Sequence, residues 1–311
     1  MKKLDNNGLP QASVFSKTFW RRNSGYFFIL PTYIFLFGVI LYPLIYNILM
    51  SFRQVDASTL NGFQPYIGFG NYQVIFSDPL FLKAIWNTLY FSVLSILFQF
   101  IIGFGLALLF SKSFPGNQFL RGILLIIWMI PILVAATLWK WIFAGDVSGV
   151  LNFILMGLGF IQEPIQWLTN SSNAMTALII SNIWRGIPFN MLLLATALTT
   201  LPGDIYEAAE IDGANPIQRF FYITMPLVKP AIVSVITLGF VYTFKAFDLI
   251  YIMTKGGPVN ATHNIATLSY INTFEQFKFG EGAAMANVLL VLLMILGIFN
   301  MLATDKDEVI S

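Results

Sequence analysis

Three charged side chains stand inside long apolar stretches of this sequence. Arg185 lies in the run 182–190 (NIWRGIPFN), and Lys245 and Asp248 lie three residues apart in a later run. Charged groups within lipid-embedded segments are costly, so they face a cavity or a partner group. The spacing of Lys245 and Asp248 brings both side chains to one face of a helix. Two interpretations remain open: a set that holds helices together, with Arg185 included, or a polar route for a hydroxyl-rich solute.

Other residue types that support catalysis are scarce. The chain has no Cys and a single histidine, His263. Thiolate metal sites, disulfides and His-paired zinc or nucleophile–base arrangements are therefore excluded. The sequence also lacks the pattern G-x4-G-K-[ST] of a phosphate-binding loop for ATP. We expect a protein that is not an enzyme and that binds no metal or cofactor itself.

The composition indicates a membrane protein. Of its 311 residues, 57% are hydrophobic and 10% are charged, and its mean hydropathy is +0.74. Soluble domains carry about 25% charged residues, so lipid is the expected solvent for most of this chain. The formal net charge of +2 is too small to suggest binding of nucleic acid.

Six apolar segments reach the length of about 20 residues that a transmembrane helix needs. They are continuous rather than alternating, which excludes barrel strands. The first is longer than a signal-peptide core and no small-residue cleavage site follows it, so we interpret it as a retained span. We predict an all-α polytopic membrane protein with a first span at 26–50 and a core at 84–303. The segments are Tyr26–Met50, Ala84–Phe110, Gly122–Ala144, Ala174–Leu198, Ala231–Thr254 and Ala283–Ala303.

The distribution of Lys and Arg predicts the orientation, because cytoplasmic loops carry an excess of both. Of the 17, ten lie on one side, four on the other and three within spans. Both tails, residues 1–25 and 304–311, are therefore predicted to be cytoplasmic. The ten are Lys2, Lys3, Lys17, Arg21, Arg22, Lys112, Arg121, Arg219, Lys229 and Lys306; the four are Arg53, Lys83, Lys255 and Lys278.

Smaller features of the spans and outer loops also carry expectations. The loop 145–173 has no Lys or Arg, and its apolar piece Val150–Phe160 is too short to span, so we expect an interfacial helix there. Gly186 and Pro188 are expected to loosen the fourth span. Asn87 and Gln99 are expected to bond neighbouring helices rather than solute. His263 has no visible partner in its outer loop.

A polar stretch between the fourth and fifth spans falls on the predicted cytoplasmic side. Within the loop 201–230, Asp204 has the position of a helix N-cap with Glu207 three residues later. Gly213 suits the position just after a helix, and Asn215 followed by proline suits the start of another. We predict two short helices joined by a glycine turn. These features allow either a plain connection between spans or a docking surface.

This stretch resembles the EAA signature of permease subunits from bacterial ABC importers, E-A-A-x3-G-x9-I-x-L-P. Met225 replaces the usual Leu, which conserves volume. The six-span arrangement is similar to the larger maltose-type permease subunit without its N-terminal extension. The matching residues are Glu207, Ala208, Ala209, Gly213, Ile223 and Pro226. Similarity to the carbohydrate branch lies in Asp212-Gly213-Ala214, Gln218, Ile223-Thr224 and Gly256-Gly257-Pro258.

The resemblance implies a type I ABC importer permease fold in a bacterial cytoplasmic (inner) membrane. It implies four kinds of partner: a second homologous permease, two cytoplasmic ATPase subunits that use ATP and Mg, an extracytoplasmic solute-binding protein, and a sugar or oligosaccharide as solute. The loop would then be a coupling helix, and ATP-driven closure of the ATPases would drive alternating access through it. The residues implied in ATPase coupling are Glu207, Ala208, Ala209, Asp212 and Gly213.

The resemblance also implies solute contacts in the spans before and after the loop, at Asn182, Gly186 and Phe189 and at Gly239, Thr243 and Ala246. With the three charged residues above, Arg185, Lys245 and Asp248, these form the predicted substrate pathway. Residue types differ from the family at several positions, notably Ala246, so the sugar stays open. The two cations leave open an acidic sugar or a phosphorylated polyol such as glycerol phosphate. A stand-alone secondary transporter is a further alternative, against which the EAA-like loop argues.

Replacing Glu207 or Gly213 is expected to leave the transporter inserted while uncoupling transport from ATP hydrolysis, because the loop would no longer transmit the motion of the ATPase. Uptake of labelled sugar and ATP hydrolysis are measured side by side in membranes that carry each variant. Full sugar uptake by both variants would contradict the coupling role.

Overall fold

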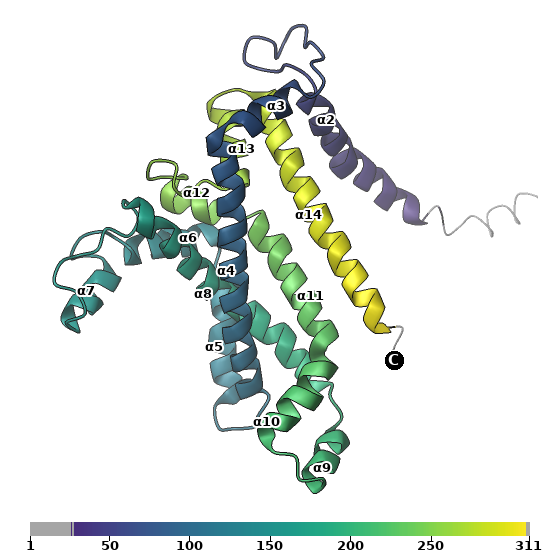
Figure 1. Ribbon diagram of the computed structural model, residues 1–311, viewed down its shortest axis with the longest axis vertical. Helices are drawn as coiled ribbons and strands as arrows, with labels where there is room; N and C mark the ends of the chain where they lie inside the picture. Colours follow the sequence, from purple (N-terminus) through teal and green to yellow (C-terminus); the bar gives the residue numbers. More distant parts are fainter. Residues whose placement is uncertain (1–25, 27, 309–311) are drawn as a thin grey trace, which may run out of the picture. The chain divides into compact units, whose positions relative to one another are not determined.

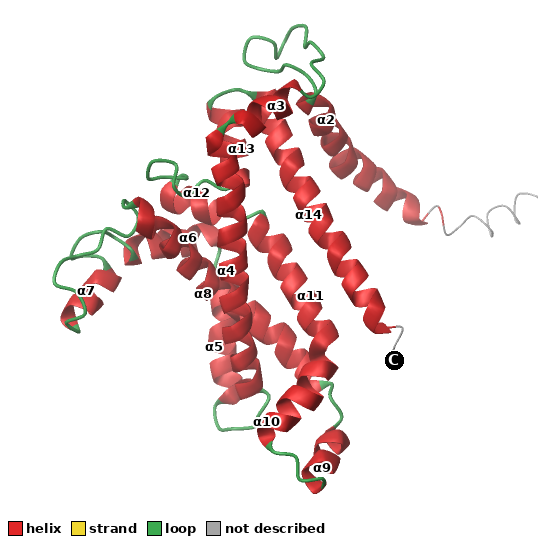
Figure 2. Cartoon of the chain, in the orientation of Figure 1, coloured by secondary structure: helices red, strands yellow, loops and turns green. Residues whose placement is uncertain are grey.

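The computed structural model describes residue 26 and residues 28–308 of the chain. The chain forms two units, Met1–Met50 and Ser51–Ser311. Throughout the described residues the backbone is helix or loop (Figure 2), apart from one isolated bridge between Arg53 and Tyr66. The predicted all-α class is confirmed.

The described part of the first unit contains a helix of membrane-spanning length, Phe28–Ser51. It passes through a π-helical turn, η1 (Leu36–Leu41), and continues as α2 (Tyr42–Ser51). Pro43 has no N–H for the carbonyl four residues earlier and crowds it, and a widened turn accommodates both effects. The tail predicted at 1–25 lies outside the described residues.

Three of the predicted spans in the second unit are single helices, as expected. All three begin before their predicted first residues, and the last two also end after their predicted last residues. They are α4 (Pro79–Phe110), α8 (Ser171–Thr199) and α14 (Phe279–Glu308). In α4, the Asp78 side chain accepts a hydrogen bond from the Leu80 N–H at 2.8 Å, and this cap lies before the predicted first residue, Ala84. The C-terminal tail predicted at 304–311 is helical as far as Glu308.

The third span is not the straight helix predicted at Gly122–Ala144. It is broken into α5 (Asn117–Met129) and α6 (Ile132–Ile142), which meet at an angle of 97°. The cause is Pro131, because a proline disfavours helical backbone in the residue before it. Ile130 accordingly has an extended conformation, with ψ of 127°. Counted as one broken span, this pair brings the described membrane-spanning segments to six.

The fifth span also differs from the prediction of one helix at Ala231–Thr254. A continuous helical segment begins at Pro216 and ends at Phe244, and a separate helix, α12 (Asp248–Thr254), follows after a three-residue break. The long segment consists of α10 (Pro216–Arg219), the π-helical η2 (Phe220–Thr224) and α11 (Met225–Phe244). The second loop helix is therefore the extension of the span rather than a separate element.

The loop between α8 and α10 contains one short helix, α9 (Gly203–Ile211). Its N-cap is Pro202 rather than the predicted Asp204, which lies in the first turn, where a carboxylate favours the helix N-terminus. Gly213 ends the helix as predicted, with φ of 83°. Its N–H donates to the Glu210 carbonyl at 3.0 Å, and the next N–H donates to the Ala209 carbonyl at 2.9 Å. This is a Schellman motif, which suits glycine because the backbone is left-handed.

The start of α10 matches its prediction. The Asn215 side chain accepts a hydrogen bond from the Gln218 N–H at 2.9 Å, and the Gln218 side chain accepts one from the Asn215 N–H at 2.8 Å. This capping box places Pro216 at the first helical position. In Figure 1, α9 and α10 lie at the lower end of the second unit, and α3 (Gly70–Ser77) and α13 (Ile265–Tyr270) lie at its upper end.

Helices α4 and α8 form the centre of the second unit. Gly103 permits their close approach, because a Cβ there would lie 2.7 Å from the Cβ of Asn190. A cluster of buried apolar side chains, which includes Phe104 and Met191, packs beside this contact. The helix α8 is continuous through Gly186 and Pro188.

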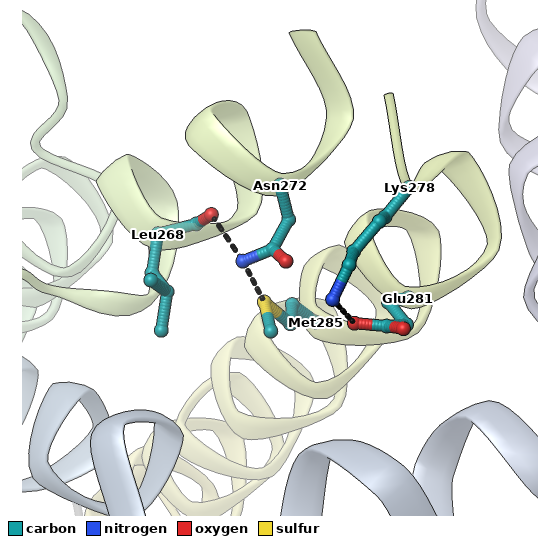
Figure 3. Close-up of polar contacts among 5 residues, drawn as sticks. All are labelled: Leu268, Asn272, Lys278, Glu281 and Met285. Carbon is teal, nitrogen blue, oxygen red and sulfur yellow. Dashed lines mark hydrogen bonds and ion pairs between the residues drawn. The ribbon is translucent and has the colours of Figure 1, made fainter. Parts of the chain in front are cut away.

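At the upper end, α13 continues into a π-helical turn, η3 (Ile271–Glu275), that packs against α14 (Figure 3). Asn272 Nδ2 donates to the Leu268 carbonyl at 3.1 Å and lies 3.7 Å from Met285 Sδ of α14. A surface ion pair joins Lys278 Nζ to Glu281 at 3.4 Å.

The short helix predicted near Val150–Phe160 is present as α7 (Val150–Gly157).

The loop after α12 is buried around His263, which is 5% exposed. Its ring Nδ1 lies 3.3 Å from the Thr267 hydroxyl, so the expectation of no partner is wrong. A side chain at Gly256 would collide with the ring, so glycine is required there. Asn87 Nδ2 donates to the carbonyls of Ala261 (3.0 Å) and His263 (2.8 Å), so it bonds this loop rather than a helix.

Acidification is expected to destabilise the fold through His263. Burial lowers the pKa of His263 below 6.5, while the charges of Glu275 and Lys83 raise and lower it to smaller extents. His263 therefore binds a proton more readily in the unfolded chain than in the folded protein. Its contribution to stability is fully present above pH 6.5 and is lost as the pH falls from 6.5 to the lowered pKa of the folded state. Thermal unfolding of purified wild type and His263→Gln is compared between pH 8 and pH 5. A difference in Tm between them that stays constant with pH would refute this assignment.

Candidate functional site

The break between α11 and α12 fixes the position of the charged residues of the fifth span. After Phe244 the helix ends, and the Ala246 N–H turns back to the Thr243 carbonyl at 3.0 Å. Asn264 Nδ2, from the buried loop after α12, donates to the Ala246 carbonyl at 2.6 Å. The non-helical backbone is thereby satisfied by protein groups, as membrane-embedded chain requires.

A cavity of about 430 Å³ opens beside this break, between α8, α11 and α12. Every residue of the predicted substrate pathway lines it. These nine residues are Asn182, Arg185, Gly186, Phe189, Gly239, Thr243, Lys245, Ala246 and Asp248. The structure therefore brings two separate spans together at one concave site.

Further lining residues were missed in the sequence. They are Gln99, Trp128, Ile132, Asn190, Tyr242, Phe247 and Leu249. Gln99 was expected only to bond a neighbouring helix, and Trp128 joins the wall from α5, which packs against α8. Tyr242 lies three residues before Lys245, a spacing that could have pointed to it.

Aromatic rings form one wall of the cavity. Trp128 of α5 stacks on Phe189 of α8, with ring centroids 5.5 Å apart and planes at 21°. Tyr242 of α11 meets Phe189 edge-on, with centroids 6.0 Å apart. Tyr242 is 59% exposed, so much of its ring is free to contact a solute. Such a wall suits the apolar face of a ring-shaped molecule.

Amide groups from α4 and α8 form a polar wall. Gln99 Nε2 donates to the Asn182 carbonyl at 2.9 Å, which confirms that Gln99 bonds a neighbouring helix. Gly186 makes this contact possible, because any Cβ would collide with the Gln99 amide. Asn190 Nδ2 donates to the Gly186 carbonyl at 2.9 Å. The Nδ2 of Asn182 is buried without a partner, so this wall retains unused hydrogen-bonding capacity.

The charged groups do not form the pair that was predicted. Among the described residues, no salt bridge joins Lys245 to Asp248, because α11 ends at Phe244 and α12 begins at Asp248, so the two residues do not share a helix face. Lys245 Nζ lies 5.5 Å from the centroid of the Tyr242 ring. Arg185 interacts electrostatically with Asp248, but its Nε is buried with no hydrogen-bond partner.

A second surface is formed by α9 and the start of α10. Of the five residues implied in coupling, Glu207, Ala208, Asp212 and Gly213 are exposed and Ala209 is half-buried. The two helices are held together by an ion pair, in which Arg219 donates to Glu210 at 2.9 Å.

A shallow groove runs beside this turn, lined by residues 212–214, Gln218, Arg219, Tyr222 and Ile223. Large apolar side chains are exposed around it, with Ile211 at 87% and Tyr222 at 79%. Exposed apolar and acidic groups on a well-capped turn are suited to contact with another protein.

Comparisons with known proteins agree with this architecture. Residues 99–304 match the family described as binding-protein-dependent transport system inner membrane component. The chain is 36% identical over 265 residues to the sulfoquinovosyl glycerol transport system permease protein SmoG of Agrobacterium fabrum, covering 85% of this chain and 84% of that protein. It is 33% identical over 270 residues to the trehalose/maltose transport system permease protein MalF of Thermococcus litoralis, covering 87% and 90%.

A solved structure has the same fold. It is a bacterial ABC transporter involved in the import of the acidic polysaccharide alginate, with a TM-score of 0.81 over 93% of this chain and 98% of that one. The sequence identity of 24% makes this a likeness of fold alone.

Gly186→Ala is expected to destabilise the protein by about 1–3 kcal/mol, because the new Cβ displaces the Gln99 amide and breaks its bond to Asn182. Gly239→Ala is the matched control, since its Cβ would lie an ordinary 3.6 Å from Ile96. Thermal unfolding in detergent compares the two variants with the wild type. Equal Tm values for the two alanine variants would show that the Gly186 contact is unimportant.

Proposed function

The chain belongs to the family of binding-protein-dependent transport system inner membrane components, the permeases of ABC transporters, and from this premise we propose that it translocates a sugar or oligosaccharide. The observation that carries the proposal is the cavity, in which an aromatic wall faces a wall of amides. Aromatic faces suit sugar rings and amides suit hydroxyl groups. The saccharide cargoes named for relatives such as SmoG and MalF support the same choice.

In this proposal the nine pathway residues contact the solute. Phe189 packs against a sugar ring, while Asn182 and Thr243 bond hydroxyl groups. Gly186 and Gly239 line the cavity where α8 and α11 pack against Gln99 and Ile96 of α4, and Ala246 lines it at the break. A solute-binding protein delivers the sugar from outside, and the site opens alternately to the two sides of the membrane.

ATP drives the cycle through separate ATPase subunits that dock on α9, with Glu207, Ala208, Ala209, Asp212 and Gly213 at the contact. The continuous helix Pro216–Phe244 supports this coupling, because it joins the docking turn directly to the cavity. At 1.5 Å per residue it is about 43 Å long, so a shift at its cytoplasmic end is carried along a single element to Thr243. The ATP and Mg are bound by the ATPases, not by this chain.

A second, homologous permease is expected to face this chain and to complete the cavity, giving a heterodimer with two ATPases. Both termini lie in the cytoplasm in this arrangement, which places α9 on the ATPase side and the loop of His263 on the side of the solute-binding protein. The excess of Lys and Arg on the α9 side supports this orientation.

The test is reconstitution of the chain in proteoliposomes with the ATPases, permease and binding protein that co-purify with it. Labelled saccharide uptake is expected to require ATP, and Phe189→Ala is expected to slow it about tenfold by removing a ring contact. Phe153→Ala is the control, since Phe153 is 72% exposed on α7, away from the cavity. Uptake driven by an ion gradient without any ATPase would refute the proposal, as would equal uptake by the two variants.

A further inference from the structure

The charges that line the cavity do not balance. Among its lining residues the cations are Arg185 and Lys245, and the single carboxylate is Asp248. Within a membrane-embedded site, a cation that lacks a counter-charge is costly. One carboxylate can compensate one cation, so the empty site keeps an excess positive charge. A solute that brings a negative charge would remove this cost when it binds.

From this imbalance we propose that the transported solute carries an acid group, a carboxylate, sulfonate or phosphate on a hydroxyl-rich molecule, and that Arg185 and Lys245 bind it. The proposal rests on the proposed function and specifies its substrate class.

Arg185 is the residue best suited to bind the acid group. Its guanidinium presents five N–H donors in a fork that matches a planar or tetrahedral oxyanion. Among the described residues it forms no hydrogen bond or salt bridge, and its Nε is buried and unpaired. Asp248 interacts with it electrostatically without reaching salt-bridge distance. The donors of Arg185 are therefore in place but unused, within the lining of a cavity.

Lys245 supplies the second charge. Lys245 lies in the non-helical break. Its Nζ lies over the ring of Tyr242, 5.5 Å from the ring centroid. A ring face attracts a cation but carries no net charge, so it leaves the ammonium charge uncompensated. The Nδ2 of Asn182 is a further buried donor with no partner at the same cavity. Unused donors thus outnumber unused anionic acceptors on the lining.

The aromatic and charged groups are arranged to bind one molecule that carries both a sugar ring and an acid group. Phe189 lies four residues after Arg185 on α8, so these two share a helix side, and Lys245 Nζ lies 5.5 Å from the centroid of the Tyr242 ring. A sugar ring on the aromatic wall would hold its acidic substituent beside the two cations. A neutral sugar would use the rings and amides and leave both cations without a counter-charge.

The experiment measures direct binding to the purified transporter, assembled with its co-purifying permease and ATPase subunits in lipid nanodiscs and free of the solute-binding protein. The labelled probes are a disaccharide with a C6 carboxylate, the matching neutral disaccharide, and glycerol 3-phosphate. The first and third probes distinguish an acidic sugar from a phosphorylated polyol. Arg185→Gln and Lys245→Gln each remove one cation, and Arg185→Lys retains the charge without the fork. Lys278→Gln is the matched control, because it removes a surface cation outside the cavity.

One acidic probe is expected to bind at least about tenfold more tightly than the neutral disaccharide, the ratio that one charge-assisted hydrogen bond supplies. Arg185→Gln and Lys245→Gln should each abolish this preference, so that the acidic and neutral disaccharides bind with similar affinity. Arg185→Lys should retain part of the preference, and Lys278→Gln should retain all of it.

Three results would overturn the proposal: equal or tighter binding of the neutral disaccharide, an acid preference that survives both Gln variants, or no binding of either acidic probe. ATP-dependent uptake of a neutral sugar, with no uptake of either acidic probe, would overturn this inference and leave the proposed function intact. Absence of uptake for every saccharide would instead count against the proposed function.

Discussion

The hydrogen bond from Asn264 to the Ala246 carbonyl is the contact on which the cavity depends. A backbone that leaves a helix within lipid must find other donors for its carbonyls, and Asn264 Nδ2 provides one at 2.6 Å. It reaches the break because its loop is buried and bonded to α4 by Asn87. With the fifth span held broken, Lys245 and Asp248 line a concave site rather than pairing along one helix.

Prolines and one glycine shape the path from the loop of α9 to this site. Pro131 bends the third span between α5, which contributes Trp128 to the aromatic wall, and α6. Pro226 has no N–H to close the turn before it, and that turn is the π-helical η2, yet the helix continues to Phe244. Gly213 then ends α9 in a conformation that other residues rarely adopt. A rigid turn is thereby connected to the cavity by one continuous element.

Among the described residues, two of the five buried polar side-chain atoms that lack a hydrogen-bond partner belong to residues that line the cavity. Gln99 is satisfied across the α4–α8 contact, which Gly186 and Gly103 make close enough. Arg185 and Asn182 retain unpaired buried nitrogen atoms where α8 faces the cavity. Unpaired groups are costly in a low-dielectric site, so their concentration on one wall indicates where a ligand would lower the free energy of the protein.

The sequence by itself determined the class of protein and the ends of its local structures. Apolar run lengths predicted the spans, Gly213 and Asn215 marked helix ends, and the EAA-like spacing identified the family, because these are local patterns that need no distant partner. The same patterns misplaced the N-cap at Asp204 and missed the break after Phe244, which no residue of the fifth span announces. Only the tertiary structure decided that break and which side chains share the cavity. The reason is physical: Asn264 acts on another span across space, and the cavity lining comes from several helices, so both appear only when the helices pack together.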